Sequence, residues 1–211
     1  WKSPRLARIW FGAVGLVALA MVVLGQAILP VLAICLILSV AAGLGELLLQ
    51  RLHVSATPLF ERLIVTIPTG VGILALLDLI LAWQGLFTTV TNWMLILVLT
   101  VPAAWGIRNL ARYEISTDLG KQPAQISAMG LAFLLNLSWA IVPEIQFDAS
   151  NVYLAVPKIY LQHGGLVDLP YIWNSYMAHL LSLFYGLCMA IGGIVAPKVL
   201  ILFFGVLALG A

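Results

Sequence analysis

Side chains that can do chemistry are most concentrated in segment 143–170, which reads PEIQFDASNVYLAVPKIYLQHGGLVDLP. The segment contains two carboxylates four residues apart, Glu144 and Asp148. Two carboxylates beside a membrane suit acid–base catalysis, or the binding of a divalent cation such as Mg²⁺ or Mn²⁺ together with a phosphate. Asp148 is therefore interpreted either as a general base or metal ligand, or as the cap of a helix. Glu144 is a second catalytic candidate, and a solvated loop residue is its structural interpretation.

Three other ionisable side chains have both a functional and a structural interpretation. Lys158 could contact a lipid phosphate or simply solvate its helix. His163 could ligate a metal, but no second histidine stands at ligand spacing on a shared helix, which favours a structural role. Asp78 lies in the apolar run LLDLILAW, where an ionisable residue is a functional candidate. Its place near the end of that run favours a snorkelling or hydrogen-bonded carboxyl.

The composition predicts the class of protein that carries these residues. The chain is 63% hydrophobic and only 9% charged, whereas soluble domains are about 25% charged. The apolar runs have helix length and do not alternate, which predicts an all-α bundle of transmembrane helices. Cys35 and Cys188 lie in separate apolar runs and are interpreted as small buried side chains. About seven spans are predicted, near 9–24, 28–49, 59–83, 93–107, 126–142, 175–191 and from 197 onward.

The chain divides into three predicted parts. Residues 1–142 form five transmembrane helices, residues 143–174 form an outward-facing loop, and residues 175–211 form helices six and seven. The sequence starts at Trp1 and ends within an apolar run, so we expect it to belong to a longer protein. It contains no Walker loop, dinucleotide-binding motif or nucleic-acid module, and nucleic acid is not an expected partner.

The basic residues predict the orientation of the bundle. With a cytoplasmic N-terminus and five spans before the loop, nine of the ten Lys and Arg residues fall on one side and Lys158 on the other. The positive-inside rule then places loop 143–174 on the periplasmic or extracellular face of the cytoplasmic membrane. The nine are Lys2, Arg5, Arg8, Arg51, Arg62, Arg108, Arg112, Lys121 and Lys198. An outer aromatic belt is expected from Trp83, Trp93, Trp139, Tyr171 and Trp173.

Within the loop, FDASNVYLAVPKIYLQHGG predicts an amphipathic helix that lies along the membrane surface. Asp148 can cap its first turn, and Pro157 is expected to kink or split it. Gly164 and Gly165 are expected to end it. Its predicted apolar face consists of Val152, Val156, Ile159 and Tyr160, with Phe147 and Val152 placed as a hydrophobic staple.

The loop also matches a recurrent residue order, roughly FDALxYHLxxPKLYLExGxI followed by PYxxxS and a helix that ends in LF and small residues. That order resembles the first outer loop of bacterial membrane glycosyltransferases of the C type (GT-C). This group includes protein mannosyltransferases and lipid A sugar transferases. The matching positions are Phe147, Asp148, Ala149, Tyr153, Leu154, Pro157, Lys158, Tyr160, Leu161, Gly164 or Gly165, Pro170, Tyr171, Ser175, Leu183 and Phe184.

The resemblance implies a reaction and assigns roles to residues. Enzymes of this group transfer a sugar from a polyprenyl-phosphate carrier outside the cytoplasmic membrane. The resemblance makes Asp148 the catalytic base, or a residue that helps to hold a metal ion and the acceptor. It places Tyr153 and Lys158 beside the carrier phosphate. Apart from the resemblance, His163 is a further candidate for substrate binding. One position departs from the pattern, because Leu154 stands where the group often has histidine.

Two other functions remain open at this point. The chain could be a non-catalytic accessory or scaffold subunit of a larger membrane complex, which Leu154 and the abrupt termini favour. Such a subunit would contact lipid or protein on most faces. A transporter fragment has less support, because Asp78 is the one plausible intramembrane carboxyl and no interrupted pair of helices is evident in the sequence.

Overall fold

The computed structural model describes residues 4–54, 58–113, 123–142, 153–172 and 180–210. These residues form helices and contain no strand, which confirms the all-α class. The apolar helices are those of a membrane protein. The helices are α1 (Pro4–Leu24), α2 (Ile28–Arg51), α3 (Leu59–Trp83), α4 (Thr89–Leu110), α5 (Pro123–Ile141), α6 (Ala155–His163), α7 (Leu180–Gly192) and α8 (Ala196–Gly210).

Small residues hold α2 against α3 and α4 at the centre of the bundle. A methyl group added to Gly70 of α3 would lie 1.7 Å from the carbonyl oxygen of Ala41 in α2. One added to Gly106 of α4 would lie 1.9 Å from the carbonyl oxygen of Gly43 in α2. Only glycine permits this backbone approach, which is how helices pack in lipid without a hydrophobic force between them.

Among the residues that the structure describes, three helices, α2, α3 and α4, are long and apolar enough to cross a membrane. The pair α7 and α8 is bent by 117° at its break and adds one more span if it is counted as a single broken segment. The 13 residues of α7 cover about 20 Å at 1.5 Å per residue, which is less than the ~30 Å of hydrocarbon. The prediction of seven spans is therefore not confirmed, and the described residues support three or four.

The bend between α7 and α8 changes the predicted path of the chain. One end of α7 packs near the α3–α4 turn, where Leu183 joins a buried cluster with Ala82. The other end packs beside the start of α2, since a methyl group on Gly192 would lie 2.7 Å from the side chain of Ala33. After the bend, Lys198 donates a hydrogen bond to the carbonyl oxygen of Val142, the residue that precedes the predicted loop 143–174. Lys198 thus lies beside the start of the loop, whereas the seven-span path placed it on the opposite side.

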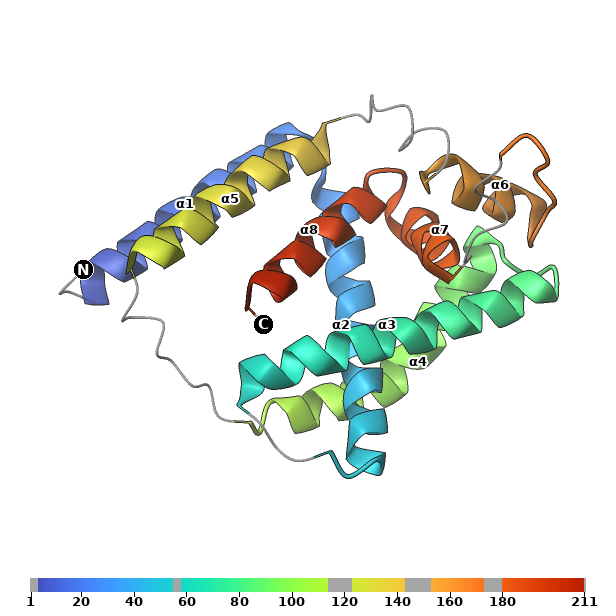
Figure 1. Cartoon of the computed structure of the whole chain (residues 1–211), viewed down its shortest axis with the longest axis horizontal. Helices are drawn as coiled ribbons and strands as arrows, with labels where there is room; N and C mark the ends of the chain where they lie inside the picture. Colours follow the sequence, from blue (N-terminus) through green and yellow to red (C-terminus); the bar gives the residue numbers. More distant parts are fainter. Residues whose placement is uncertain (1–3, 55–57, 114–122, 143–152, 173–179, 211) are drawn as a thin grey trace.

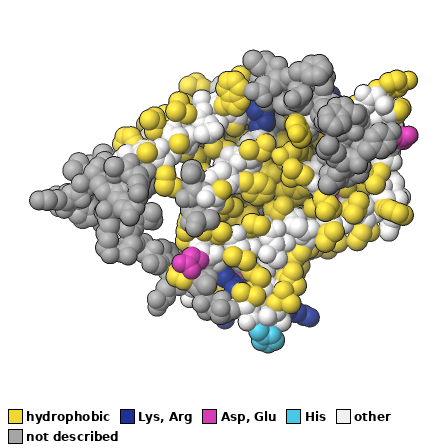
Figure 2. All heavy atoms as spheres, in the orientation of Figure 1, with side chains coloured by type: hydrophobic (Ala, Val, Ile, Leu, Met, Phe, Trp, Pro, Cys, Tyr) yellow, Lys and Arg dark blue, Asp and Glu magenta, His cyan; other side chains and the backbone are white. Residues whose placement is uncertain are grey.

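Figure 1 shows α1 and α5 side by side as a pair, with α8 between this pair and the crossing of α2 with α3 and α4. Hydrophobic side chains cover much of the face seen in Figure 2. Four of the five residues predicted for an aromatic belt have exposed side chains, and the fifth, Trp173, lies outside the described residues. The four are Trp83, Trp93, Trp139 and Tyr171. An apolar exterior of this kind, together with the apolar helices, fits a lipid environment.

Candidate functional site

Helix α6 is the described part of the predicted site, and both of its ends follow from local sequence. It begins at Ala155, so Pro157 lies in the first turn, where a missing N–H breaks no intrahelical bond. It ends at Gly164, which has φ +75° and caps the helix in the left-handed conformation. The predicted glycine end is therefore confirmed. The predicted kink or split at Pro157 remains a prediction, because the preceding residues 143–152 lie outside the described part of the chain. The proposed Asp148 cap and the Phe147–Val152 staple lie outside the described residues.

The apolar face of α6 packs against protein. Val156 and Tyr160 are buried in one cluster with Ala82 of α3, Phe87 of the α3–α4 turn and Leu183 of α7. The sequence predicted that this face would meet the membrane surface, and that prediction is not confirmed. Burial, with a further contribution from the charge of Asp168, raises the pKa of the Tyr160 hydroxyl above its ordinary value.

Backbone contacts fix the end of α6 to the α3–α4 turn. The Phe87 amide donates to the Gly164 carbonyl at 2.7 Å, and the Leu166 amide donates to the Ala82 carbonyl at 3.4 Å. A methyl group added to Gly165 would lie 2.6 Å from the same Ala82 carbonyl oxygen. The α3–α4 turn and α6 together form what we call the loop end of the bundle.

The predicted site residues are only partly brought together. Tyr153, Lys158 and His163 have exposed side chains at the loop end. The ring of His163 makes a local contact, with Nδ1 2.9 Å from the Ile159 carbonyl oxygen. Lys158 and His163 are five residues apart on α6, about 140° around its axis, so they do not share one face. Glu144 and Asp148 lie outside the described residues.

The described part of the chain contains no set of side chains that could ligate a metal ion. No three His, Cys, Asp or Glu side chains lie close together among those residues. The prediction that Asp148 ligates a divalent cation falls on a segment that the structure does not describe, and it remains a prediction.

A second polar site lies at the opposite end of the bundle and was not predicted. We call it the arginine end, because Arg51, Arg62, Arg108 and Arg112 lie there at the termini of α2, α3 and α4. Arg62 was counted among the charges of the cytoplasmic side, and its side chain is only 2% exposed. Its Nε donates to Oε2 of Glu46 at 2.7 Å, and its Nη2 donates to Oε1 at 3.3 Å. This is a buried, bidentate ion pair.

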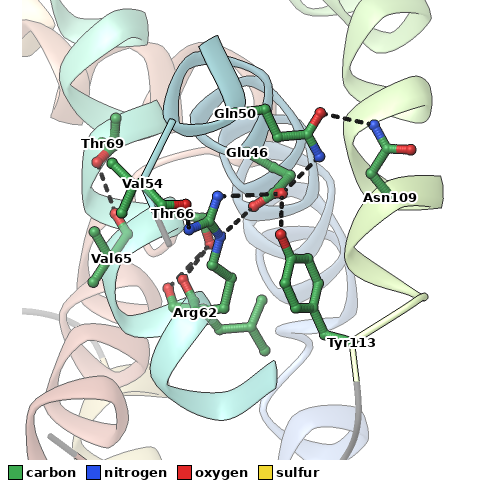
Figure 3. A network of polar contacts seen from close by, with 10 residues as sticks. Glu46, Gln50, Val54, Arg62, Val65, Thr66, Thr69, Asn109 and Tyr113 are labelled. Carbon is green, nitrogen blue, oxygen red and sulfur yellow. Dashed lines mark hydrogen bonds and ion pairs between the residues drawn. The ribbon is translucent and has the colours of Figure 1, made fainter. Parts of the chain in front are cut away.

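Further hydrogen bonds satisfy the Glu46 carboxylate (Figure 3). Gln50 donates to its Oε1 at 2.8 Å, and the Tyr113 hydroxyl donates to the same oxygen at 3.0 Å. Asn109 in turn donates to Gln50 at 3.1 Å. These bonds link α2, α3 and the segment after α4. We call the network the clamp, because it holds these parts together and both charges of the Glu46–Arg62 pair have partners within it.

The clamp perturbs Tyr113, whose hydroxyl lies beyond the end of α4. Partial burial, the hydrogen bond to Glu46 and the negative charge of that carboxylate together raise the pKa of Tyr113 above its ordinary value of 10.0. The Arg62 guanidinium lies 5.5 Å from the centre of the Tyr113 ring and opposes this shift. One signal in the sequence could have found the clamp: Glu46 is a carboxylate inside the apolar run GLGELLLQR.

Asp78 of α3 is the remaining predicted candidate. The prediction that its carboxyl snorkels to water or is hydrogen-bonded was wrong. The side chain is 0% exposed, so it does not snorkel. Among the groups that the structure describes, neither carboxyl oxygen has a hydrogen-bond partner. The position one to two turns before Trp83 therefore does not bring the carboxyl to water.

Comparison with protein-family models, with curated proteins and with solved structures found no match to this chain. The assignment of a function therefore depends on the residues and their arrangement.

Proposed function

We propose that this chain carries the first outer loop of a membrane glycosyltransferase of the GT-C kind, which uses a polyprenyl-phosphate sugar as donor. The observation that carries the proposal is the segment PKIYLQHGG, which resembles the GT-C loop motif. In the structure this segment is α6, a short helix tied to the α3–α4 turn. Segment 143–152, which contains both candidate carboxylates, leads directly into that helix.

The proposed reaction takes place at the loop end, on the outer face of the cytoplasmic membrane. Asp148 accepts the proton of an acceptor hydroxyl as that oxygen bonds to the anomeric carbon of the sugar. The bond between this carbon and the phosphate oxygen breaks, and the polyprenyl phosphate leaves. Lys158, exposed on α6, would neutralise charge that develops on the leaving phosphate, with Tyr153 beside it. Glu144 is the second candidate base.

The separation of the two ends of the bundle supports an outward loop. The arginine end carries Arg51, Arg108 and Arg112 as exposed cations, whereas Lys158 is the exposed cation of α6. Basic residues favour the cytoplasmic side, so the arginine end would face the cytoplasm and α6 would face outward. A carrier phosphate on the outer leaflet would then meet the loop end.

The test is transfer of a labelled sugar from a polyprenyl-phosphate donor by membranes that contain the full-length protein. We expect Asp148→Asn to reduce transfer by roughly 10²–10⁴-fold, the usual contribution of a general base. Glu61→Gln, an exposed carboxylate in the first turn of α3 at the arginine end, is the matched control and should retain full transfer. Unchanged transfer by Asp148→Asn would remove that residue from the mechanism.

The same assay tests the competing proposal of an accessory subunit. Three observations favour it: Tyr153, Lys158 and His163 are spread around the loop end, the apolar face of α6 is used for internal packing, and Leu154 replaces a histidine of the motif. A scaffold subunit would show no transfer in either the native protein or the Asp148→Asn variant. Its partners would instead co-purify with it, and deletion of this protein would cause their complex to dissociate.

A further inference from the structure

Asp78 is a buried carboxyl that neither the clamp at the arginine end nor the proposed transfer reaction uses. It lies on α3, five residues before the last helical residue, Trp83. That spacing puts it about 7 Å from the helix end along the axis, inside a candidate span. Its side chain is 0% exposed, and neither oxygen has a hydrogen-bond partner among the described groups. A carboxylate anion in such a place would be costly, because no group that the structure describes replaces its hydration.

The ionisable groups on the elements packed against α3 do not neutralise Asp78. On α7, the thiol of Cys188 lies near enough to interact electrostatically with the Asp78 carboxyl, and it carries no positive charge. On α2, Glu46 bonds to Arg62, which precedes Asp78 by sixteen residues, or about 24 Å of helix axis. On α8, Lys198 bonds to the carbonyl oxygen of Val142.

The remaining ionisable residues of α2 also leave Asp78 without a countercharge. Arg51 is exposed at the arginine end, and Cys35 is an exposed thiol. A second buried polar residue, Asn92 in the first turns of α4, has an oxygen without a hydrogen-bond partner among the described groups, and an amide cannot supply charge. The neutral acid is therefore the form of Asp78 that this packing accommodates.

We propose that Asp78 is a reversible proton-binding site inside the bundle, occupied by a proton when α3 and α7 are packed as they are here. Loss of that proton would leave an anion between two apolar helices and would favour their separation. The site takes a proton as its ligand, and it does not depend on the sugar transfer proposed above. A positively charged partner would have to approach from outside the described residues to hold the ionised form in place.

The side from which the proton arrives is indicated by a line of polar groups on α7. Tyr185 and Cys188 are three residues apart and therefore lie on one face of α7. Tyr185 lies within electrostatic range of Cys188 and of Tyr153, which is 55% exposed at the loop end. The exposure of these side chains falls from Tyr153 through Tyr185, at 8%, to Cys188 and Asp78, both at 0%. A local opening between α3 and α7 would therefore connect Asp78 to water at the loop end.

Dicyclohexylcarbodiimide, an apolar reagent that adds to neutral carboxyl groups, tests the proposal on the full-length protein in membranes. The carboxyl proton moves to a reagent nitrogen, the carboxyl oxygen bonds to the central carbon, and an oxygen-to-nitrogen acyl shift gives a stable N-acylurea without loss of any atom. We expect the α3 peptide with Asp78 to carry the full mass of the reagent. Labelling should fall as the pH is raised, because the neutral form is depleted.

Glu46 supplies an internal control, because it is as buried as Asp78 but paired with Arg62. We expect Asp78 to label much more than Glu46, whose carboxylate oxygens are occupied by Arg62, Gln50 and Tyr113. Asp78→Asn should abolish the α3 label. Equal labelling of Glu46 and Asp78, or labelling of Asp78 that is independent of pH, would overturn the proposal.

Infrared absorption decides the case in which the reagent does not reach Asp78. The carbonyl band of a neutral carboxylic acid should be present in the native protein near neutral pH and reduced in Asp78→Asn, a variant of the same shape. Size-exclusion chromatography of both proteins establishes that the variant is folded. If the band is unchanged by the substitution, Asp78 is ionised in the folded protein and the proposed proton site does not exist.

Discussion

Glu46 and Asp78 are both completely buried carboxyls, yet their surroundings are opposite. Glu46 accepts hydrogen bonds from Arg62, Gln50 and Tyr113. Asp78 has no hydrogen-bond partner among the described groups. The same side-chain chemistry therefore serves two purposes: a satisfied charge that joins three parts of the chain, and an unsatisfied acid that can respond to its surroundings. Burial by itself does not distinguish the two, whereas the donors around the oxygens do.

The largest expected effect on stability comes from removing one residue of the Glu46–Arg62 ion pair. Glu46→Ala or Arg62→Ala leaves an uncompensated charge in the interior, and we expect a loss of about 3–5 kcal/mol in the free energy of unfolding. Unfolding in detergent, followed by circular dichroism, measures the loss. The double variant Glu46→Leu with Arg62→Met removes both charges and should recover much of the stability. If the two single losses instead add in the double variant, the residues are not coupled as the structure has them.

The glycine contacts next to the clamp give the second largest effect. Gly70→Ala puts a methyl group against the Ala41 carbonyl and forces α2 and α3 apart, at a cost of about 1–3 kcal/mol or more. Gly72→Ala is a matched control two residues later on the same helix, where an added methyl group has no neighbour within 4 Å. That control should be neutral or slightly stabilising, by up to about 1 kcal/mol. Equal losses in the two variants, measured by thermal unfolding, would contradict the close crossing of α2 and α3.

The hydrogen bond from Tyr113 to Glu46 can be tested through the pH dependence of stability. Its pKa is raised in the folded protein, so its contribution to stability is complete below its ordinary pKa of 10.0 and is lost as the pH rises through the folded value. We expect the unfolding temperature to fall with increasing pH in the alkaline range. Tyr113→Phe should cost about 1 kcal/mol near neutral pH, because one hydrogen bond to Glu46 is lost. The variant should also flatten the alkaline fall, and an unchanged slope would show that other groups cause it.

Substitution of Asp78 should change the free energy of unfolding least among these variants, in contrast to substitution of Glu46. Asp78→Leu removes an acid without hydrogen-bond partners among the described groups, and we expect a change between zero and a gain of about 1 kcal/mol. Glu46→Leu alone, measured in the same unfolding assay, should be strongly destabilising because it removes the carboxylate that neutralises the buried Arg62. Comparable losses at both positions would mean that Asp78 has structural partners of its own.

Much of the local structure could be predicted from the sequence. The third predicted span, 59–83, has the same bounds as α3, and the second, 28–49, ends two residues before α2 does. The end of α6 at Gly164 was also predicted, because glycine readily adopts the left-handed conformation that caps a helix. Hydropathy and capping depend on neighbours in the chain, so one sequence is sufficient for them.

The path of the last two helices and the burial of polar groups could not be predicted in this way. A break between 191 and 197 was expected, and it occurs at Gly193, which has φ +76°. Its direction was not expected, and the 117° bend turns α8 so that Lys198 reaches Val142. A hydropathy window counts apolar residues and contains no information about the angle between successive helices.

Composition and apolar run length alone therefore determined that this is an all-α membrane protein and where most of its helices lie. The tertiary structure decided which charges are neutralised. Arg62 was counted among the cytoplasmic cations and forms a buried ion pair with Glu46. Asp78 was expected to snorkel or to be hydrogen-bonded, and its buried carboxyl has no hydrogen-bond partner among the described groups. The physical reason is the separation along the sequence of the residues that interact. Helix formation and capping depend on residues a few positions apart, whereas the partner of a buried charge comes from another helix. Only packing brings Glu46 and Arg62, sixteen residues apart, within 2.7 Å.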